Sequence, residues 1–387
     1  MPPTVTRQQY ITTVTDQTNI RVNIADVIDQ LSPTETPLIT AIGRESLRFP
    51  CDQIKHEWLE DELRPRETTL AAAYTAGSGS LTVQTAAANY FAIDDLLLIG
   101  DNVLQILSGP PGSATFIVVG GVGGSTDANA LISAKVRKIA SALHEASTSR
   151  LDVSKTAVVK PFNYTQIIRD QCVISGTMAV IRRYGYVSER AYQEEKALRQ
   201  LAIDMEYAML YGVRSYAAGP PRRSTFGGLF EFIYLAGVAG GWATVVNAAG
   251  AQFTEVALNN LLQAIWTKGG MPNLLVVNGF NKRVVTSWAS PRIRTERAEG
   301  TAGSTIGSYE SEFGTLDIML NRWLRPTDVL LLTTADIGMG PLEGRAFSSR
   351  EVPSLGDYTQ TEILGEYTME VHRPAMAHGW LYGTAES

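Results

Sequence analysis

Residues 188–211 carry one long helical pattern, in a chain whose other apolar segments are short. Ser188 is a residue type that caps helices, and Gly212 is a type that ends them. At 1.5 Å per residue this helix would be about 36 Å long. Its polar positions are held by Glu189, Arg190, Glu194, Glu195, Arg199 and Glu206. Its apolar positions recur every three to four residues, at Leu198, Leu201, Met205, Ala208 and Met209. We therefore expect a spine helix with one buried face.

The segments before this helix do not read as an independent core. Residues 1–50 hold only short apolar runs, which Pro33, Pro37 and Pro50 separate, so this stretch reads as an arm that needs a neighbour. Residues 53–63 begin with strand-like alternation, and the Arg64-Pro65-Arg66 run stops it. Between residues 81 and 119, short β-like runs alternate with turn residues, which predicts a small strand-rich subdomain.

The segments after the helix predict a local α/β unit. Residues 255–268 and 280–289 read as helices on either side of the apolar strand 274–277. Residues 292–308 contain hardly any apolar residue and are expected to be a mobile loop. Extended segments follow at residues 313–324, 329–333 and 361–371, the last with a row of glutamates on one face.

Composition excludes several classes of protein. A chain with 44% hydrophobic and 19% charged residues is too apolar to be disordered. A net charge of -6 provides no positive field for recruiting nucleic acid. The two cysteines, Cys51 and Cys172, favour buried thiols in a reducing compartment over a disulfide. The polar N-terminus and the lack of any apolar run of about 18 residues argue against a signal peptide and a membrane span.

Chemical motifs are weak throughout. The glycine-rich run 118–126, followed by a possible helix over residues 127–144, suggests a phosphate cradle, but Thr126 stands where a third glycine is needed. We favour a turn. His56-Glu57 and His144-Glu145 lack the second histidine of a zinc-protease motif, and no nucleophile signature is present. We predict no catalytic residue, no metal and no cofactor.

Motifs along most of the chain resemble those of the tailed-phage major capsid (major head) proteins of the HK97-like fold, and most of all the SU10-like major head protein family. They lie in the arm, the extended loop, the spine helix and the later strands. They are Thr36-Pro37-Leu38, His56-Glu57-Trp58, Asp61-Glu62-Leu63, Asn163-Tyr164-Thr165, Tyr192-Gln193, Gly227-Gly228, Gly269-Gly270, Phe313-Gly314, Asn321-Arg322, Gly356-Asp357 and His378-Gly379.

The resemblance implies an α+β fold in five parts. These are an N-terminal arm (1–52), an extended β-loop (53–160) bearing a small β-rich insertion (about 81–146), a peripheral domain (161–225) with the spine helix 188–211, an α/β axial domain (226–346) with the mobile loop 292–308, and C-terminal strands of the peripheral domain (347–387).

The same resemblance implies a non-enzymatic subunit that self-assembles as pentamers and hexamers into the icosahedral head of a double-stranded-DNA phage. It would be assembled in the bacterial cytoplasm and reside in the virion. The expected partners are other copies of the chain, a scaffolding protein, a portal protein at one vertex, decoration proteins and the packaged DNA, with no membrane. The interface residues that we expect are Pro37, His56, Glu57, Trp58, Arg64, Arg66, Arg292, Arg294 and Arg297.

Two other functions compete with this one. A cytosolic α/β enzyme with an accessory β-domain would bind a phosphate-containing ligand at residues 120–126. Another virion or secretion component, such as a tail tube subunit that builds open rods, would also self-assemble, but the long helix 188–211 weighs against a mostly β tube protein.

Overall fold

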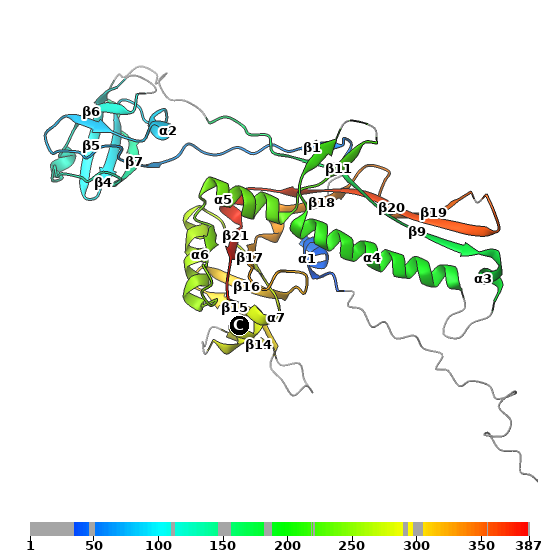
Figure 1. Ribbon diagram of the computed structural model, residues 1–387. Coiled ribbons are helices and arrows are strands. Elements are labelled where there is room, and N and C mark those ends of the chain that lie inside the picture. Colours follow the sequence, from blue (N-terminus) through cyan, green and yellow to red (C-terminus); the bar gives the residue numbers. More distant parts are fainter. Residues whose placement is uncertain are drawn as a thin grey trace, which may run out of the picture. The chain divides into compact units, whose positions relative to one another are not determined.

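The computed structural model of the protein describes residues 35–45, 51–109, 113–145, 156–181, 188–217, 219, 221–288, 293–296, 305–353 and 355–385 (Figure 1). The chain divides into two compact units. Unit 1 comprises Met1–Trp58 and Phe162–Ser387, and unit 2 comprises Leu59–Pro161.

The spine helix of unit 1 is α4, Glu189–Tyr211, and it confirms the predicted helix. The Ser188 hydroxyl accepts a hydrogen bond from the Ala191 amide, as a capping residue should. Two predicted positions were wrong: Leu198 is exposed, and Glu206 is fully buried instead of lying on the polar surface. Burial follows contacts with other elements, which helical spacing alone does not specify.

The helix α4 lies along an antiparallel four-stranded sheet (Figure 1). The 14-residue strand β20 (Tyr358–Val371) is its centre. β20 pairs with β9 (Gln166–Ser175), β18 (Ile337–Pro341) and β19 (Ser348–Val352). Because side chains alternate across a strand, Ile363 faces α4 and the core, whereas Glu362 faces the opposite side.

A second, seven-stranded sheet of unit 1 separates two cores. Its order is β12 (Val245–Asn247), β21 (Gly379–Tyr382), β17 (Val329–Leu332), β13 (Leu274–Val277), β16 (Gly314–Leu320), β15 (Thr305–Ser311) and β14 (Ile293–Glu296). Leu275 and Val277 of β13 pack in a core with α6 (Glu255–Thr267) and α7 (Gly279–Ser287), whereas Leu274 and Val276 join the core that includes α4. Burial on both faces explains why β13 and β17 are uninterrupted apolar runs.

Shorter elements connect these sheets. They are α1 (Pro37–Glu45), β1 (Lys55–Glu57), β8 (Phe162–Tyr164), α3 (Gly176–Val180), β10 (Ser215–Ala217), β11 (Arg223–Thr225), the π-helix Phe230–Leu235, α5 (Ala236–Gly240), the 3-10 turn Thr334–Asp336 and α8 (Pro374–Ala377).

Strand pairing changes several expected boundaries in unit 1. The stretch expected as a mobile loop, 292–308, contains β14 and the start of β15, which pair as an antiparallel hairpin. Residues 297–304 lie outside the described residues. β21 falls in the stretch expected among the C-terminal peripheral strands, yet it pairs with β17 and β12 of the seven-stranded sheet. β18, expected in the axial domain, pairs with β20. Backbone pairing between segments far apart in sequence decides these assignments.

Unit 2 is a small closed barrel. Its six strands run in the order β2 (Glu67–Thr69), β7 (Lys135–Ser141), β4 (Asp95–Ile99), β5 (Asn102–Ser108), β6 (Thr115–Val119) and β3 (Ser80–Thr82). A bridge between Leu70 and Val83 closes the ring, with the Ala71 amide 3.0 Å from the Thr82 carbonyl oxygen. The short helix α2 (Thr85–Ala88) adds Ala88 to the barrel core.

The barrel differs from the expected insertion in two ways. It starts at Glu67, because Leu70 and Tyr74 belong to its core, instead of near residue 81. The possible helix over residues 127–144 is wrong, since this stretch contains β7. Val136 of β7 is buried between polar neighbours, which is the alternation of a strand.

Candidate assembly surfaces

The helix α1 is fixed to the body of unit 1 by a buried carboxylate. Glu206 of α4 accepts hydrogen bonds from the amides of Leu38 (2.9 Å) and Ile39 (3.0 Å) in the first turn of α1. The side-chain amide of Asn321 donates a third bond of 2.7 Å. First-turn amides have no partner inside their own helix, so Glu206 acts as a cap supplied by a distant element. Burial raises the pKa of Glu206, against the lowering effect of these bonds.

Further contacts hold the start of α1. The side chains of Leu38 and Ile42 are buried in the core that includes α4. The Trp323 indole nitrogen donates to the Glu35 carbonyl oxygen over 2.8 Å. These contacts fix the position of residues 35–42 on unit 1.

A buried acid and two histidines lie beside the root of the extended loop. β1 pairs antiparallel with β8, and His56 of β1 contacts Glu370 of β20 through its Nε2 atom. His372 places its own Nε2 atom 2.9 Å from the other carboxylate oxygen. Burial raises the pKa of Glu370, but the bonds from both imidazoles outweigh this effect and lower it to about 2. Glu370 is therefore an ionised group that holds β1 against the sheet.

Glu370 is the end of a row of glutamates on β20. Glu362 lies 2.6 Å from an Arg350 guanidinium nitrogen, and Glu366 lies 2.7 Å from Arg345 Nε. The Arg350 bond lowers the pKa of Glu362. The three carboxylates are nearly buried, and each pairs with an arginine or histidine side chain. The expected glutamate row is confirmed, and its role is to bind basic side chains within the subunit.

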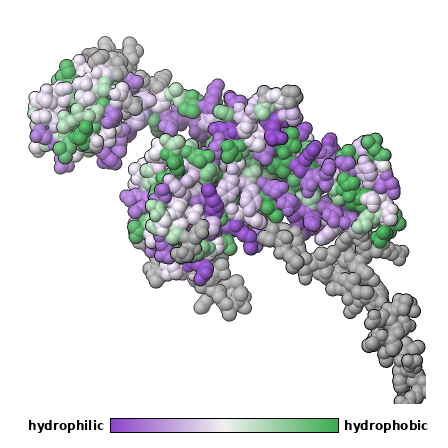
Figure 2. Space-filling view, viewed as in Figure 1, coloured by the Kyte–Doolittle hydropathy of each residue, from purple (hydrophilic) through white to green (hydrophobic). Residues whose placement is uncertain are grey.

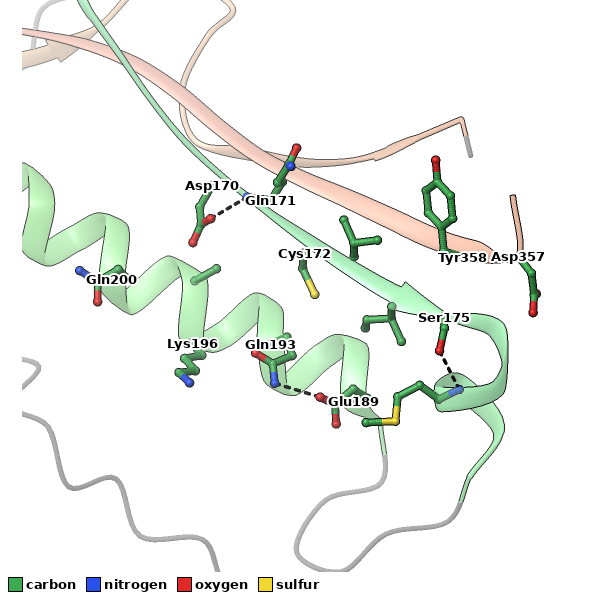
Figure 3. A pocket seen from close by; sticks show the side chains of 14 residues that line it. Asp170, Gln171, Cys172, Ser175, Glu189, Gln193, Lys196, Gln200, Asp357 and Tyr358 are labelled. Carbon is green, nitrogen blue, oxygen red and sulfur yellow. Dashed lines mark hydrogen bonds between the residues drawn. The ribbon is translucent and has the colours of Figure 1, made fainter. Parts of the chain in front are cut away.

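A groove of about 870 Å³ lies on the other face of this sheet (Figure 3). Asp170 and Cys172 of β9 point toward α4, which lines the opposite wall with Gln193 and Gln200. Burial, and then the charges of Glu194 and Glu189, raise the pKa of Cys172. A thiol with a raised pKa is a poor nucleophile, so the groove offers space for a chain segment and no activated catalytic group.

The glycine-rich run surrounds a carboxylate instead of a phosphate cradle. A Cβ atom on Gly120 would lie 2.4 Å from the Asp127 carboxylate, which explains the glycine there. Tyr74 donates to one Asp127 oxygen over 3.0 Å, and the Gly77 amide donates to the other over 2.9 Å. These bonds lower the pKa of Asp127, led by that of Gly77. A fixed negative charge at this position repels phosphate.

The expected interface residues fall into separate places. Pro37 begins α1, His56 pairs with Glu370, and Glu57 pairs with Lys55. Trp58 is 6% exposed and packs against Phe232 and His372 within its own subunit.

The arginines expected at the interface lie at exposed positions, in a strand or outside the described residues. Arg64 and Arg66 are exposed before β2. Arg294 lies in β14, opposite Ser308, and Arg292 and Arg297 lie outside the described residues. An interface role for these nine residues stays a prediction.

Sequence reasoning missed the residues that organise unit 1. The sequence held one signal that Glu206 is buried. It lies directly after Met205 and three residues before Met209, and both of these are buried apolar positions of the helix. Its partners, 115 and 168 residues away, gave none. Within the described residues, no group of histidine, cysteine and acidic side chains is arranged to hold a metal ion. No described helix is long and apolar enough to cross a membrane.

Comparisons with known proteins agree on one fold. A family model described as SU10 major capsid protein matches residues 6–385. The structure is similar to that of a capsid of an empty GTA particle (TM-score 0.56, 9% identity, 97% of this chain and 100% of that one). It is also similar to the capsid of cyanophage A-1(L) (TM-score 0.56, 10% identity, 97% and 100%) and to Mycobacterium phage Bobi (TM-score 0.51, 10% identity, 98% and 100%). No curated protein matches the chain significantly.

Proposed function

The chain belongs to the SU10 major capsid protein family, and on this premise we propose that it builds the phage head as rings of five and six subunits that close into an icosahedral shell. It is the major capsid protein, has the HK97-like fold, resides in the virion and is not an enzyme. The observation that carries the proposal is the family match over residues 6–385, together with capsid structures that cover nearly the whole chain.

Within that shell we assign the parts of the chain as the resemblance implies. Residues 1–52 serve as the arm and residues 53–160 as the extended loop. The peripheral domain consists of 161–225 with 347–387 and the axial domain of 226–346, except that β18 pairs with the peripheral strand β20 and β21 pairs within the axial sheet. The Glu206 cap supports an arm that starts from a fixed position, and the His56–Glu370 pair supports a loop whose root is held in place.

The proposed interface residues form two groups, one that acts on the interface from within its own subunit and one that contacts a neighbour. Pro37, His56, Glu57 and Trp58 set the directions in which the arm and the loop leave unit 1. Arg64, Arg66, Arg292, Arg294 and Arg297 meet acidic or backbone acceptors of a neighbour, since a guanidinium suits bidentate pairing between surfaces. The proposed partners beyond other copies are a scaffolding protein during assembly, a portal protein, decoration proteins and the enclosed DNA. A net charge of -6 disfavours tight binding of the subunit to that DNA.

Electron microscopy of the purified full chain, alone and with a candidate scaffolding protein, tests the proposal. We expect closed icosahedral particles, or rings that include hexamers near 252 kDa, six times the 42.0 kDa subunit. A species of one or two subunits that never assembles, even with scaffolding protein, would contradict it. The enzyme alternative requires a gain in thermal stability with phosphate or nucleotide. No observation favours this alternative, and the Asp127 carboxylate opposes it.

A further inference from the structure

The outer face of the β4–β5–β6 meander in unit 2 is aliphatic. Strands of an antiparallel barrel usually place apolar residues inside and polar residues outside. Here the inward residues Leu97, Leu104 and Phe116 are buried as expected. The outward positions are nevertheless also aliphatic, and we call them the meander patch: Leu96, Leu98, Val103, Leu107, Ile117 and Val119.

The strand register makes this patch continuous. Leu98 lies opposite Val103 across β4 and β5, and Ile117 lies opposite Ser108 across β5 and β6, next to Leu107. Leu107, Ile117 and Val119 are 49%, 56% and 43% exposed. The other three members are partly exposed, and Figure 2 shows hydrophobic residues on the visible face of this unit.

The six patch residues are uncharged, and one basic and one acidic residue lie at their edges. Arg137 of β7 lies opposite Leu98 and pairs with Glu67, and Gln105 of β5 donates a hydrogen bond to the Asp94 carboxylate. An aliphatic face with flanking charges of opposite sign can meet an identical face without net repulsion.

Barrel closure limits how a partner can bind. The Leu70–Val83 bridge joins β2 to β3, so the ring leaves no open edge at that junction for an added strand. A partner must therefore pack against the face. With six partly exposed aliphatic side chains, the patch presents on the order of a few hundred Å², which is typical of a functional surface on a monomer. It is smaller than the ~800 Å² per partner of a stable binary complex, so it acts where another contact already holds the two partners together.

We propose that the meander patch is a contact between copies of this chain, covered by unit 2 of a neighbouring subunit in the assembled shell. The inference rests on the proposed function, because shell assembly supplies the other contacts. It goes beyond that function because it assigns the insertion a direct contact that stabilises the shell. Both the aliphatic face, with its flanking charges of opposite sign, and the small area favour a second copy over a free soluble partner.

The test compares two lysine substitutions in the full chain. Ile117→Lys places a charge in the patch, and Ile132→Lys places the same charge in a turn of the same unit, where Ile132 is 61% exposed. We expect Ile117→Lys to form about tenfold fewer shells, or shells that dissociate at lower urea, since the contact would bury an unpaired charge. Ile132→Lys should behave as the parent chain does. Equal yield and urea resistance for both variants would overturn the inference.

A second measurement keeps the test decisive if Ile117→Lys misfolds. Shells of Ile117→Cys are treated with a short bismaleimide, and Ile132→Cys and the parent chain, which retain Cys51 and Cys172, set the background. We expect a covalent dimer of the chain from Ile117→Cys alone. A product with a protein of another mass, or no product above background, overturns the inference. If the parent chain and Ile132→Lys form no shells at all, the proposed function fails and this inference fails with it.

Discussion

The carboxylate of Glu206 lies 2.9 Å from the backbone amide of Leu38, although 168 residues separate them in sequence. The bond joins the spine helix to the first turn of α1, and it is fully buried. Because each orphan amide of a buried helix terminus needs an acceptor, this side chain helps to determine where α1 docks, together with the buried side chains of Leu38 and Ile42. Assembly roles assigned to the arm therefore depend on a residue of the spine.

Replacing Glu206 by alanine should detach α1. The change leaves the amides of Leu38 and Ile39 and the side-chain amide of Asn321 without their acceptor, at a cost of about 3 kcal/mol. We expect a lower melting temperature and faster proteolysis within residues 35–45, measured by calorimetry and by mass spectrometry of the fragments. Glu195→Ala removes an exposed carboxylate from the same helix and should change neither. Equal proteolysis of the two variants would count against the cap.

Glu370 should make the subunit sensitive to acid. Its pKa is lowered to about 2 in the folded state, so it binds a proton less readily than in the unfolded chain, where the value is 4.5. The stability it contributes is complete above pH 4.5 and is lost as pH falls toward 2, to a total of about 3 kcal/mol. Urea titrations of the parent and Glu370→Gln should show a stability difference that shrinks across this window. A difference independent of pH would show that the carboxylate charge is not the cause.

His378 should affect the stability of the subunit in a higher pH range than Glu370 does. The His378 side chain is fully buried, and its Nδ1 accepts from the Thr333 amide. Burial, the largest cause, lowers its pKa from 6.5 to about 4. The unfolded chain therefore binds the proton more readily, and stability falls by up to about 3 kcal/mol as pH drops from 6.5 to 4.

Substituting His378 by glutamine isolates this effect, because glutamine can still accept the Thr333 bond but does not titrate. The fall in unfolding free energy between pH 6.5 and 4, measured by urea titration, should be smaller in His378→Gln than in the parent. Parallel curves for the two proteins would contradict a buried neutral imidazole.

Gly228 should tolerate no side chain. A Cβ atom there would lie 2.6 Å from the Ala208 carbonyl oxygen and 2.7 Å from that of Met209, at the end of α4. We expect Gly228→Ala to destabilise the subunit by about 2 kcal/mol, measured by chemical unfolding. Gly279→Ala is the matched control, since Gly279 begins α7 with open space around its Cβ position and should gain up to about 1 kcal/mol. Similar effects at both positions would refute the close approach at Gly228.

Local pattern was enough to predict several elements. Capping by Ser188 and the repeat of apolar residues predict α4 almost to the residue, and the run Leu274–Val277 coincides with β13. Turn residues between short apolar runs predict β4, β5 and β6. These succeed because helix caps, turns and side-chain periodicity depend on neighbouring residues.

The sequence by itself determined the presence of a long spine helix, a strand-rich insertion and an α/β unit, and its ordered motifs identified the capsid family. Only the tertiary structure decided that Glu206 is a buried cap, that β21 and β18 exchange the sheets expected for them, and that the insertion closes as a barrel through Leu70 and Val83. The physical reason is that backbone pairing and desolvation depend on which distant segments meet, and the spacing of residues along one segment carries no record of that.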